Sequence, residues 1–265
     1  MNDVKTSLEF IQTTTGVEKL VYVGHSQGTS EGFVLLTDPS THEWANNLIS
    51  HYVGLAPICL MTHFRQKMIL ILSKHKQEVE ELFKLLKIWK FAGTNCKYSA
   101  EKREWWNLQC AVDQKSCYHV YTFMDQFPEM DDLSRTGIYL NTRPQSLSVK
   151  SMIHYAQLIS KPTDKPEFAM FDYGPEENFK VYGQLTAPVW DLGNIKTKMT
   201  FLVGTGDYFS TVQDVTNLKD RLVNAKQVEM KVIDKYGHTT MVLGVENYEL
   251  MTDLVNELKS ESQLN

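Results

Sequence analysis

The chain alternates short apolar runs with segments of helical periodicity. Four of the apolar runs end near Val23, Pro57, Val203 and Ile233, and each of them ends at or just before a glycine, proline or aspartate. Short runs bounded in this way, and rich in β-branched and aromatic residues, are typical of buried strands. The pattern therefore predicts four strands.

Helical periodicity follows three of these strands. Helices are expected over Thr29–Leu36, over Val212–Asn224 and over about residues 247–258. In the second of these segments the apolar positions share one face: Val212, Val215, Leu218 and Leu222. The carboxy-terminal part of the chain is thus predicted to run strand, helix, strand, helix.

A further amphipathic helix is expected over Glu78–Phe91, where apolar residues form one stripe and lysines follow the opposite flank. The stripe consists of Val79, Leu82, Phe83, Leu86 and Trp89, with Leu85 and Ile88 beside it.

The junction after the first strand is the pentapeptide Gly24-His25-Ser26-Gln27-Gly28. A Gly-x-Ser-x-Gly sequence between a strand and a helix is the pattern of a nucleophile elbow. The sharp turn exposes the serine hydroxyl, and the glycines make room for a strained backbone and for close helix packing. Ser26 is therefore the candidate nucleophile. The backbone N–H of Gln27 is the candidate donor to the oxyanion of a tetrahedral intermediate.

An activated serine needs a base and an acid, and the chain offers both in the order serine, acid, histidine. The turn that ends in Asp207 follows the strand ending at Val203, and His238 follows the next strand. Asp207 is the candidate acid and His238 the candidate base. The alternative acid, Asp214, lies inside a predicted helix rather than at the end of a strand.

His25 is adjacent to Ser26, and its backbone faces the wrong way for a base. We expect it to pack under the turn.

The chain resembles the acid lipases, the group that contains the gastric and lysosomal lipases. The resemblance covers nearly the whole chain, and it is loose only from about residue 66 to residue 126. It rests on the elbow region 10–29 and on Leu133-Ser134-Arg135, residues 148–157, Phe171-Asp172-Tyr173-Gly174, Tyr182-Gly183-Gln184, residues 188–192, the acid loop 204–207 and Gln213-Asp214-Val215.

The resemblance implies an α/β-hydrolase fold, a mostly parallel sheet flanked by helices, with a helical cap inserted over the site. Residues 1–57 and 148–265 would form the core and residues 58–147 the cap or lid. The chain begins about two dozen residues before Ser26, so the amino-terminal strands and the second oxyanion donor of this family are expected to be missing. A sheet lacking them would expose an edge.

The sequence departs from the family pattern at two places. The histidine loop reads Gly237-His238-Thr239-Thr240, where the family usually has asparagine before the histidine and an apolar–acidic pair after it. Glu31 stands where an apolar or small residue is usual. Neither change removes an atom of the candidate triad.

Composition and charge exclude several other classes of protein. The net charge of −5 argues against a nucleic-acid partner, and no apolar run approaches the ~20 residues of a membrane span. No signal-like apolar segment opens the chain. The four cysteines have no Cys-x-x-Cys spacing, so no zinc site is expected. Cys110 and Cys117 are the preferred disulfide, and Cys59 is expected to be a buried free thiol.

The resemblance implies a serine ester hydrolase of neutral lipids, acylglycerols or sterol esters, that needs no cofactor or metal. It further implies work at a lipid–water interface at acidic pH, in a secreted or lysosomal setting. The helix over Glu78–Phe91 is then either a lid that contacts lipid or an ordinary helix packed against its neighbours. Two other functions stay open: a catalytically impaired homologue that only binds lipid or a partner, and another α/β-hydrolase such as a thioesterase.

Overall fold

The computed structural model describes residues 2–91, 122–135 and 146–263, with a few single positions between these ranges. Within these residues the central sheet has four parallel strands in the order β1-β2-β5-β6. The strands are β1 (Leu20–His25), β2 (Ile49–Leu55), β5 (Lys198–Gly204) and β6 (Val228–Ile233). All four match strands predicted from the sequence.

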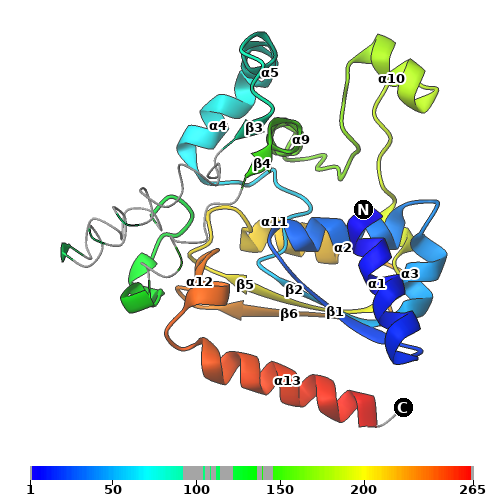
Figure 1. Ribbon diagram of the computed structural model, residues 1–265, viewed down its shortest axis with the longest axis vertical. Helices are drawn as coiled ribbons and strands as arrows, with labels where there is room; N and C mark the ends of the chain where they lie inside the picture. The colour runs from blue at the N-terminus through cyan, green and yellow to red at the C-terminus, as the bar shows by residue number, and fades with distance from the viewer. Residues whose placement is uncertain are drawn as a thin grey trace.

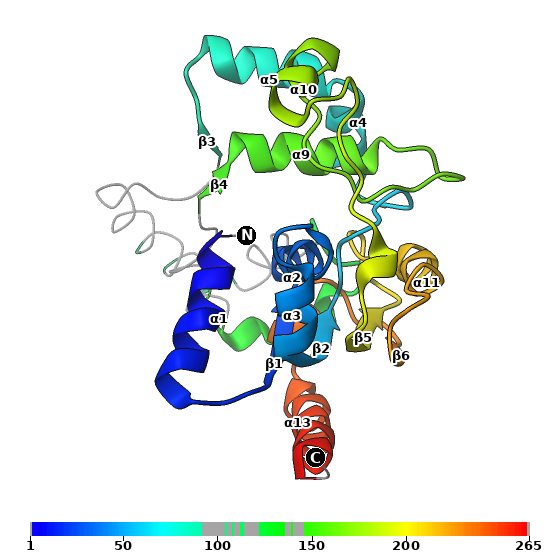
Figure 2. The ribbon, with the colours of Figure 1, turned by 90° about the vertical axis from the view of Figure 1, so that its right-hand side faces the viewer.

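Helices cover both faces of this sheet (Figures 1 and 2). One face carries α2 (Gln27–Thr37), α3 (His42–Leu48) and α11 (Val212–Lys219), and α1 (Asn2–Thr15) buries Leu8 in the same core. The opposite face carries α12 (Thr240–Leu243) and α13 (Asn247–Gln263). A parallel sheet between helices is the α/β architecture that the sequence predicted.

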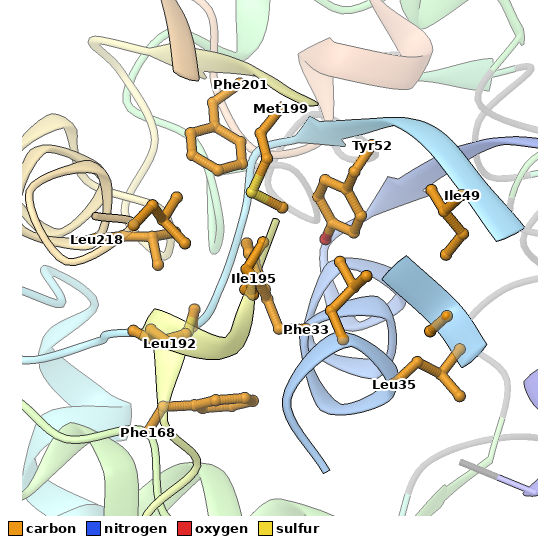
Figure 3. Packing of buried hydrophobic residues seen from close by; sticks show 14 of the residues in the cluster. Phe33, Leu35, Ile49, Tyr52, Phe168, Leu192, Ile195, Met199, Phe201 and Leu218 are labelled. Carbon is orange, nitrogen blue, oxygen red and sulfur yellow. The ribbon is translucent and has the colours of Figure 1, made fainter. Parts of the chain in front are cut away.

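Aromatic side chains fill the core between α2 and the sheet (Figure 3). Phe33 of α2 lies against Tyr52 of β2 and Phe201 of β5, with ring centroids 5.0 and 6.0 Å away. Tyr52 also stacks on Tyr22 of β1 at 5.3 Å. A Cβ at Gly32 would lie 2.5 Å from the Tyr52 ring, so α2 sits on the sheet as closely as its backbone allows. This contact fixes the position of α2 on the sheet.

A second helical layer lies beyond α2 and α11, on the side away from the sheet (Figures 1 and 2). It contains α4 (Lys67–Lys74), α5 (Lys76–Leu85), α9 (Val149–Ile159) and an antiparallel pair, β3 (Lys90–Phe91) with β4 (Leu147–Ser148). Val79 and Phe83 of α5 pack against Val149 and Ile153 of α9. The layer thus includes a helix that follows residue 148, and the division into core and cap at residues 57/58 and 147/148 stays a prediction.

The remaining elements in the described part of the chain are α10 (Pro175–Tyr182) and the short 3₁₀ segments Pro128–Met130, Leu133–Arg135 and Leu192–Asn194.

The predicted helix over Glu78–Phe91 is wrong at its carboxy-terminal end. Helix α5 stops at Leu85, and Lys87 has a φ of 53°, which an α-helix does not accommodate. The chain then enters β3. Leu82, Leu85, Leu86 and Trp89 of the predicted stripe are exposed, while Val79 and Phe83 face α9.

The other predicted helices are present with shifted ends. Helix α11 ends at Lys219 rather than Asn224, although Leu222 is still buried, and α13 continues to Gln263. Helices α1, α3, α4, α9, α10 and α12 were not predicted.

The outer strands of the described sheet are β1 and β6. Val21 and Val23 of β1 and Val232 of β6 are exposed. Among the described helices, none combines the length and the apolarity that crossing a bilayer requires. Cys59 is buried and free, as predicted, whereas Cys110 and Cys117 lie outside the described residues.

Candidate active site

Ser26 occupies the turn between β1 and α2, with φ 54° and ψ −121°. A positive φ at a residue with a side chain is strained by about 1–3 kcal/mol and persists only where the surroundings enforce it. Here the Ser26 N–H donates to the carbonyl of Leu55 at 3.1 Å, and the Ser26 carbonyl accepts from Thr29 Oγ1 at 2.5 Å. The end of β2 and the first turn of α2 therefore hold the strained serine.

The two glycines of the motif have different structural roles. A Cβ at Gly24 would lie 2.8 Å from backbone atoms of Gly28 and 2.9 Å from the Thr29 nitrogen. A Cβ at Gly28 would meet nothing within 4 Å among the described residues. Gly24 is therefore required by the close approach of α2, as the sequence predicted, and space among the described residues does not require Gly28.

The three predicted site residues come together. Ser26 Oγ lies 2.6 Å from His238 Nε2, and His238 Nδ1 lies 2.9 Å from Asp207 Oδ2. A carboxylate can only accept, so the proton of a neutral His238 belongs on Nδ1, which leaves Nε2 to accept from the serine hydroxyl. This is the arrangement of a nucleophile, a base and an orienting acid.

The second oxygen of Asp207 is held by the backbone. Its Oδ1 accepts from the N–H groups of Phe209 at 2.7 Å and Ser210 at 2.8 Å. Asp207 and His238 are both buried. The carboxylate is therefore fixed on both sides and cannot turn away from the imidazole.

The charge state of His238 reflects two opposing effects. Burial lowers the pKa of the imidazole, but the Asp207 carboxylate and its hydrogen bond raise it, and the Asp125 carboxyl adds to the increase. The pKa of His238 is raised overall above its ordinary value of 6.5. Asp207 thus stabilises the protonated form of the imidazole.

Asp214, the alternative acid, serves a different histidine. It accepts from the backbone N–H of His63 at 2.9 Å, lies 2.9 Å from His63 Nδ1 and accepts from Thr211 Oγ1 at 3.0 Å. These contacts join α11 to the loop after β2. The geometry therefore favours Asp207 over Asp214 as the partner of His238.

The side chain of His25 contacts the backbone of His238 and does not take its place as the base. Its Nε2 lies 2.9 Å from the carbonyl oxygen of His238, and the two rings are 5.2 Å apart. His25 packs beside the turn, as expected, and it also supports the histidine loop.

Sequence reasoning missed a buried carboxyl that touches the same loop. Asp125 lies between Met124 and Gln126, whose backbones bond to the acid loop, and its side chain reaches Thr239. No motif marks Asp125, and it lies in the part of the chain where the family resemblance is loose. The only sign of this contact was the unusual Gly237-His238-Thr239-Thr240 sequence.

An apolar cavity of about 350 Å³ opens at Ser26. Its lining includes Met61, Phe64, Met68, Met152 and Phe209. Its volume falls in the range of small-molecule sites, and apolar walls beside one reactive group are typical of them. A larger cavity of about 570 Å³ between α5 and α9 has a polar lining with Lys76 and Asp172 and contains none of the three site residues. Within the described ranges, no cluster of histidine, cysteine and carboxylate side chains is suited to hold a metal ion.

Sequence comparison finds lipases. The chain is 24% identical to mouse lipase member K over 98% of its length, and 25% identical to human lipase member J over 93%. It is 29% identical to rat gastric triacylglycerol lipase over 91% of its length. The chain resembles the acid lipases. It spans less than two thirds of these acid lipase relatives, namely 63%, 64% and 58% of their lengths. No protein-family model matches it.

Structure comparison identifies the fold. One similar structure is a monoglyceride lipase from Saccharomyces cerevisiae, solved with a substrate analog. The match covers 98% of this chain and 67% of the yeast chain, with a TM-score of 0.53 and 13% sequence identity. A monoacylglycerol lipase from Paleococcus ferrophilus is also similar. The match covers 97% of this chain and 75% of the lipase chain, with a TM-score of 0.51 and 15% sequence identity. The acid lipase-like chain has the α/β-hydrolase fold.

Proposed function

We propose that this chain is a carboxylic ester hydrolase that acts through an acyl-enzyme on Ser26. The observation that carries the proposal is the hydrogen-bonded series Ser26–His238–Asp207, which joins three separate loops at one end of the sheet. The lipase names of the sequence relatives point to the same reaction class.

In the first step Ser26 Oγ attacks the ester carbonyl carbon while His238 Nε2 takes the hydroxyl proton. The imidazolium that forms is stabilised by Asp207, and the ester carbonyl becomes an oxyanion. Protonated His238 then gives its proton to the leaving alcohol as the carbon–oxygen bond breaks. A water molecule repeats the sequence on the acyl-enzyme and releases the acid.

The backbone N–H of Gln27 is the proposed donor to the oxyanion. Gln27 is the first residue of α2, and the first N–H groups of a helix have no acceptor within the helix. A donor at this position contributes roughly 10²–10³ in rate in enzymes of this kind. Gln27 Nε2 also donates to Glu31 Oε1 at 3.1 Å, so the side chain is directed along α2 rather than across Ser26.

We further propose that the substrates are neutral lipid esters, acylglycerols or sterol esters. The apolar cavity at Ser26 favours a hydrocarbon acyl chain, because burying apolar surface contributes about 0.8 kcal/mol for each CH₂ group. The exposed apolar residues of α4 and α5, among them Met68, Ile71, Leu82 and Leu85, suit contact with a lipid surface. A secreted or lysosomal setting fits the gastric lipase relatives.

A fluorophosphonate probe tests the central claim, because such probes label a serine only where a base and an oxyanion site activate it. We expect the chain to be labelled and the Ser26→Ala variant, shown to be folded by circular dichroism, to remain unlabelled. Absence of labelling in the folded unmodified chain contradicts the hydrolase proposal and favours a homologue that only binds lipid.

A series of nitrophenyl esters of increasing acyl length, followed by emulsified triacylglycerol, tests the substrate class. We expect kcat/KM to rise with chain length and emulsified lipid to be hydrolysed. Preference for short thioesters over emulsified lipid contradicts the lipid proposal and indicates another α/β-hydrolase.

A further inference from the structure

Two buried carboxyl groups meet at the hydroxyl of the residue that follows His238. Thr239 Oγ1 hydrogen-bonds to Asp125 Oδ2 and also lies 3.2 Å from Asp131 Oδ2. The Thr239 N–H lies 3.2 Å from both Asp125 oxygens. Asp125, Asp131 and Thr239 are all buried.

The number of protons at this junction is limited. A threonine hydroxyl has one proton to donate, so it can serve only one of the two carboxyls. The other carboxyl can hydrogen-bond to Thr239 Oγ1 only by donating a proton of its own. Asp131 Oδ1 is buried and forms no hydrogen bond of good geometry in the described structure, although the Thr240 hydroxyl is close enough to lower the pKa of Asp131. Leaving this oxygen so poorly bonded costs far less for a neutral acid than for a carboxylate. The geometry thus calls for one proton on the pair.

The charged groups around Asp125 and Asp131 also favour one proton on this pair of carboxyls. Asp125 is surrounded by Asp131, Asp207 and His238, and Asp131 also faces Glu129. Burial, followed by the charge of Asp131, raises the pKa of Asp125 to about 8, despite the opposing effect of His238. Burial raises the pKa of Asp131 to about 6, although hydrogen bonds from the Thr240 and Thr239 hydroxyls act in the opposite direction.

Asp125 also lies directly against the residue before the base. A Cβ at Gly237 would lie 2.2 Å from Asp125 Oδ1 and 2.3 Å from its Cγ. Asp125 therefore contacts the backbone on both sides of His238. The backbone of its own segment is tied to the acid loop, by Gln126 N–H to the carbonyl of Gly206 at 2.9 Å and Tyr208 N–H to the carbonyl of Met124 at 3.1 Å. The base, the acid loop and the 122–131 segment thus form one connected unit.

We propose that Asp125 is a positioning residue for His238, and that it holds the histidine loop only while the Asp125–Asp131 pair keeps one proton. The proposal rests on the proposed function. When both carboxyls are ionised, they repel each other and Asp207, and Thr239 can no longer bridge them. The imidazole then loses its alignment with Ser26, so reactivity falls on the alkaline side.

The test compares Asp125→Asn with Asp125→Ala, using the rate of Ser26 labelling by the fluorophosphonate probe as a function of pH. An asparagine side chain has an acceptor oxygen and a donor nitrogen where a protonated Asp125 has an acceptor and a donor oxygen, but it cannot ionise. In the unmodified chain we expect the rate to fall about tenfold or more above about pH 8, since small displacements of reacting groups cost up to about 10²-fold. In Asp125→Asn this fall should be absent. Asp125→Ala should be slower at every pH.

A second readout follows the pair without using activity. The pKa of Asp125 is raised from 3.8 in the unfolded chain to about 8 in the folded chain, so the unfolded chain binds fewer protons in this interval. The contribution of Asp125 to the free energy of unfolding is therefore fully present below pH 3.8 and is lost as the pH rises toward about 8. As the pH rises through this window, the unmodified chain should lose thermal stability that Asp125→Asn keeps. The Tm of Asp125→Asn relative to that of the unmodified chain should therefore increase by several degrees. The control Asp164→Asn, an exposed carboxylate of another loop, should gain nothing.

Each result has one meaning. An alkaline fall that persists in Asp125→Asn, or that is absent from the unmodified chain, overturns the positioning role and leaves the proposed function standing. A Tm difference that does not change with pH overturns the shared proton. A folded chain that no probe labels overturns the proposed function itself, and the positioning role with it. If Asp125→Ala does not fold, Thr239→Val removes the bridging hydroxyl and should lower the labelling rate in its place.

Discussion

The imidazole Nε2 of His25 lies 2.9 Å from the carbonyl oxygen of His238, so the residue before the nucleophile holds the loop that carries the base. Removing this hydrogen bond while keeping a ring is possible with His25→Phe. A hydrogen bond contributes about 0.5–1.5 kcal/mol, so we expect the labelling rate of Ser26 to fall roughly threefold to tenfold with the fold intact. The exposed His75→Phe provides the control and should label at the normal rate. Equal rates in both variants would show that His25 is only a packing residue.

The two aspartates considered as the acid are predicted to differ in their effects. Asp207→Asn leaves the shape of the site but removes the charge that orients His238, and should slow labelling about 10³–10⁴-fold. Asp214→Asn weakens the contacts to His63 and Thr211 and should mainly lower the free energy of unfolding, by about 1–3 kcal/mol. Labelling kinetics and urea denaturation of both variants check this. A loss of labelling in folded Asp214→Asn alone contradicts the assignment.

The glycines of the elbow form a matched pair for a stability measurement. Gly24→Ala places a Cβ 2.8 Å from the Gly28 backbone and should destabilise the chain by about 1–3 kcal/mol. Gly28→Ala enters open space inside a helix and should be neutral or stabilising by about 0.5–1 kcal/mol. Urea denaturation measures both. Equal destabilisation would mean that Gly28 is also confined.

The raised pKa of His238 predicts the acid side of the pH profile. Below that pKa the imidazole is protonated and cannot accept the serine proton, so labelling should decline with a midpoint above 6.5. Stopped labelling reactions across the acidic and neutral range give the midpoint directly. A maximum well below 6.5 would instead agree with the acidic working pH that the family resemblance implies.

The apolar cavity at Ser26 predicts a change in chain-length preference. Ala156 of α9 lies in its lining, and Ala156→Phe should fill part of it. We expect kcat/KM for long-chain nitrophenyl esters to fall at least tenfold, while short esters change little, because the loss of a few buried CH₂ groups costs about 0.8 kcal/mol each. Val255→Phe, on the exposed side of α13, is the control. A uniform decrease for all esters would place the acyl chain elsewhere.

The site was accessible from sequence because its three side chains follow strands directly. Ser26, Asp207 and His238 each lie in a turn at the carboxyl end of a parallel strand, and such ends meet at one edge of the sheet. Local pattern and chain order therefore selected three residues that the structure brings together, with Asp207 rather than Asp214 beside His238.

Other features depend on contacts that leave no periodic trace. Helix α5 stops at Leu85 although the apolar stripe continues to Trp89, because Lys87 takes a positive φ and the chain turns into β3. The contact of Asp125 with Thr239 joins residues 114 positions apart in the chain. Neither residue belongs to a motif, and only the packed structure brings them together.

The backbone at Ser26 has a consequence for how the protein can be monitored. Its positive φ is enforced by Leu55 of β2 and by the first turn of α2, so local opening of that junction relaxes the serine into an ordinary turn. Such opening costs less than complete unfolding. Covalent labelling of Ser26 is therefore a gauge of the intact β1–α2 junction, and during gradual denaturation it should disappear before the helical signal does.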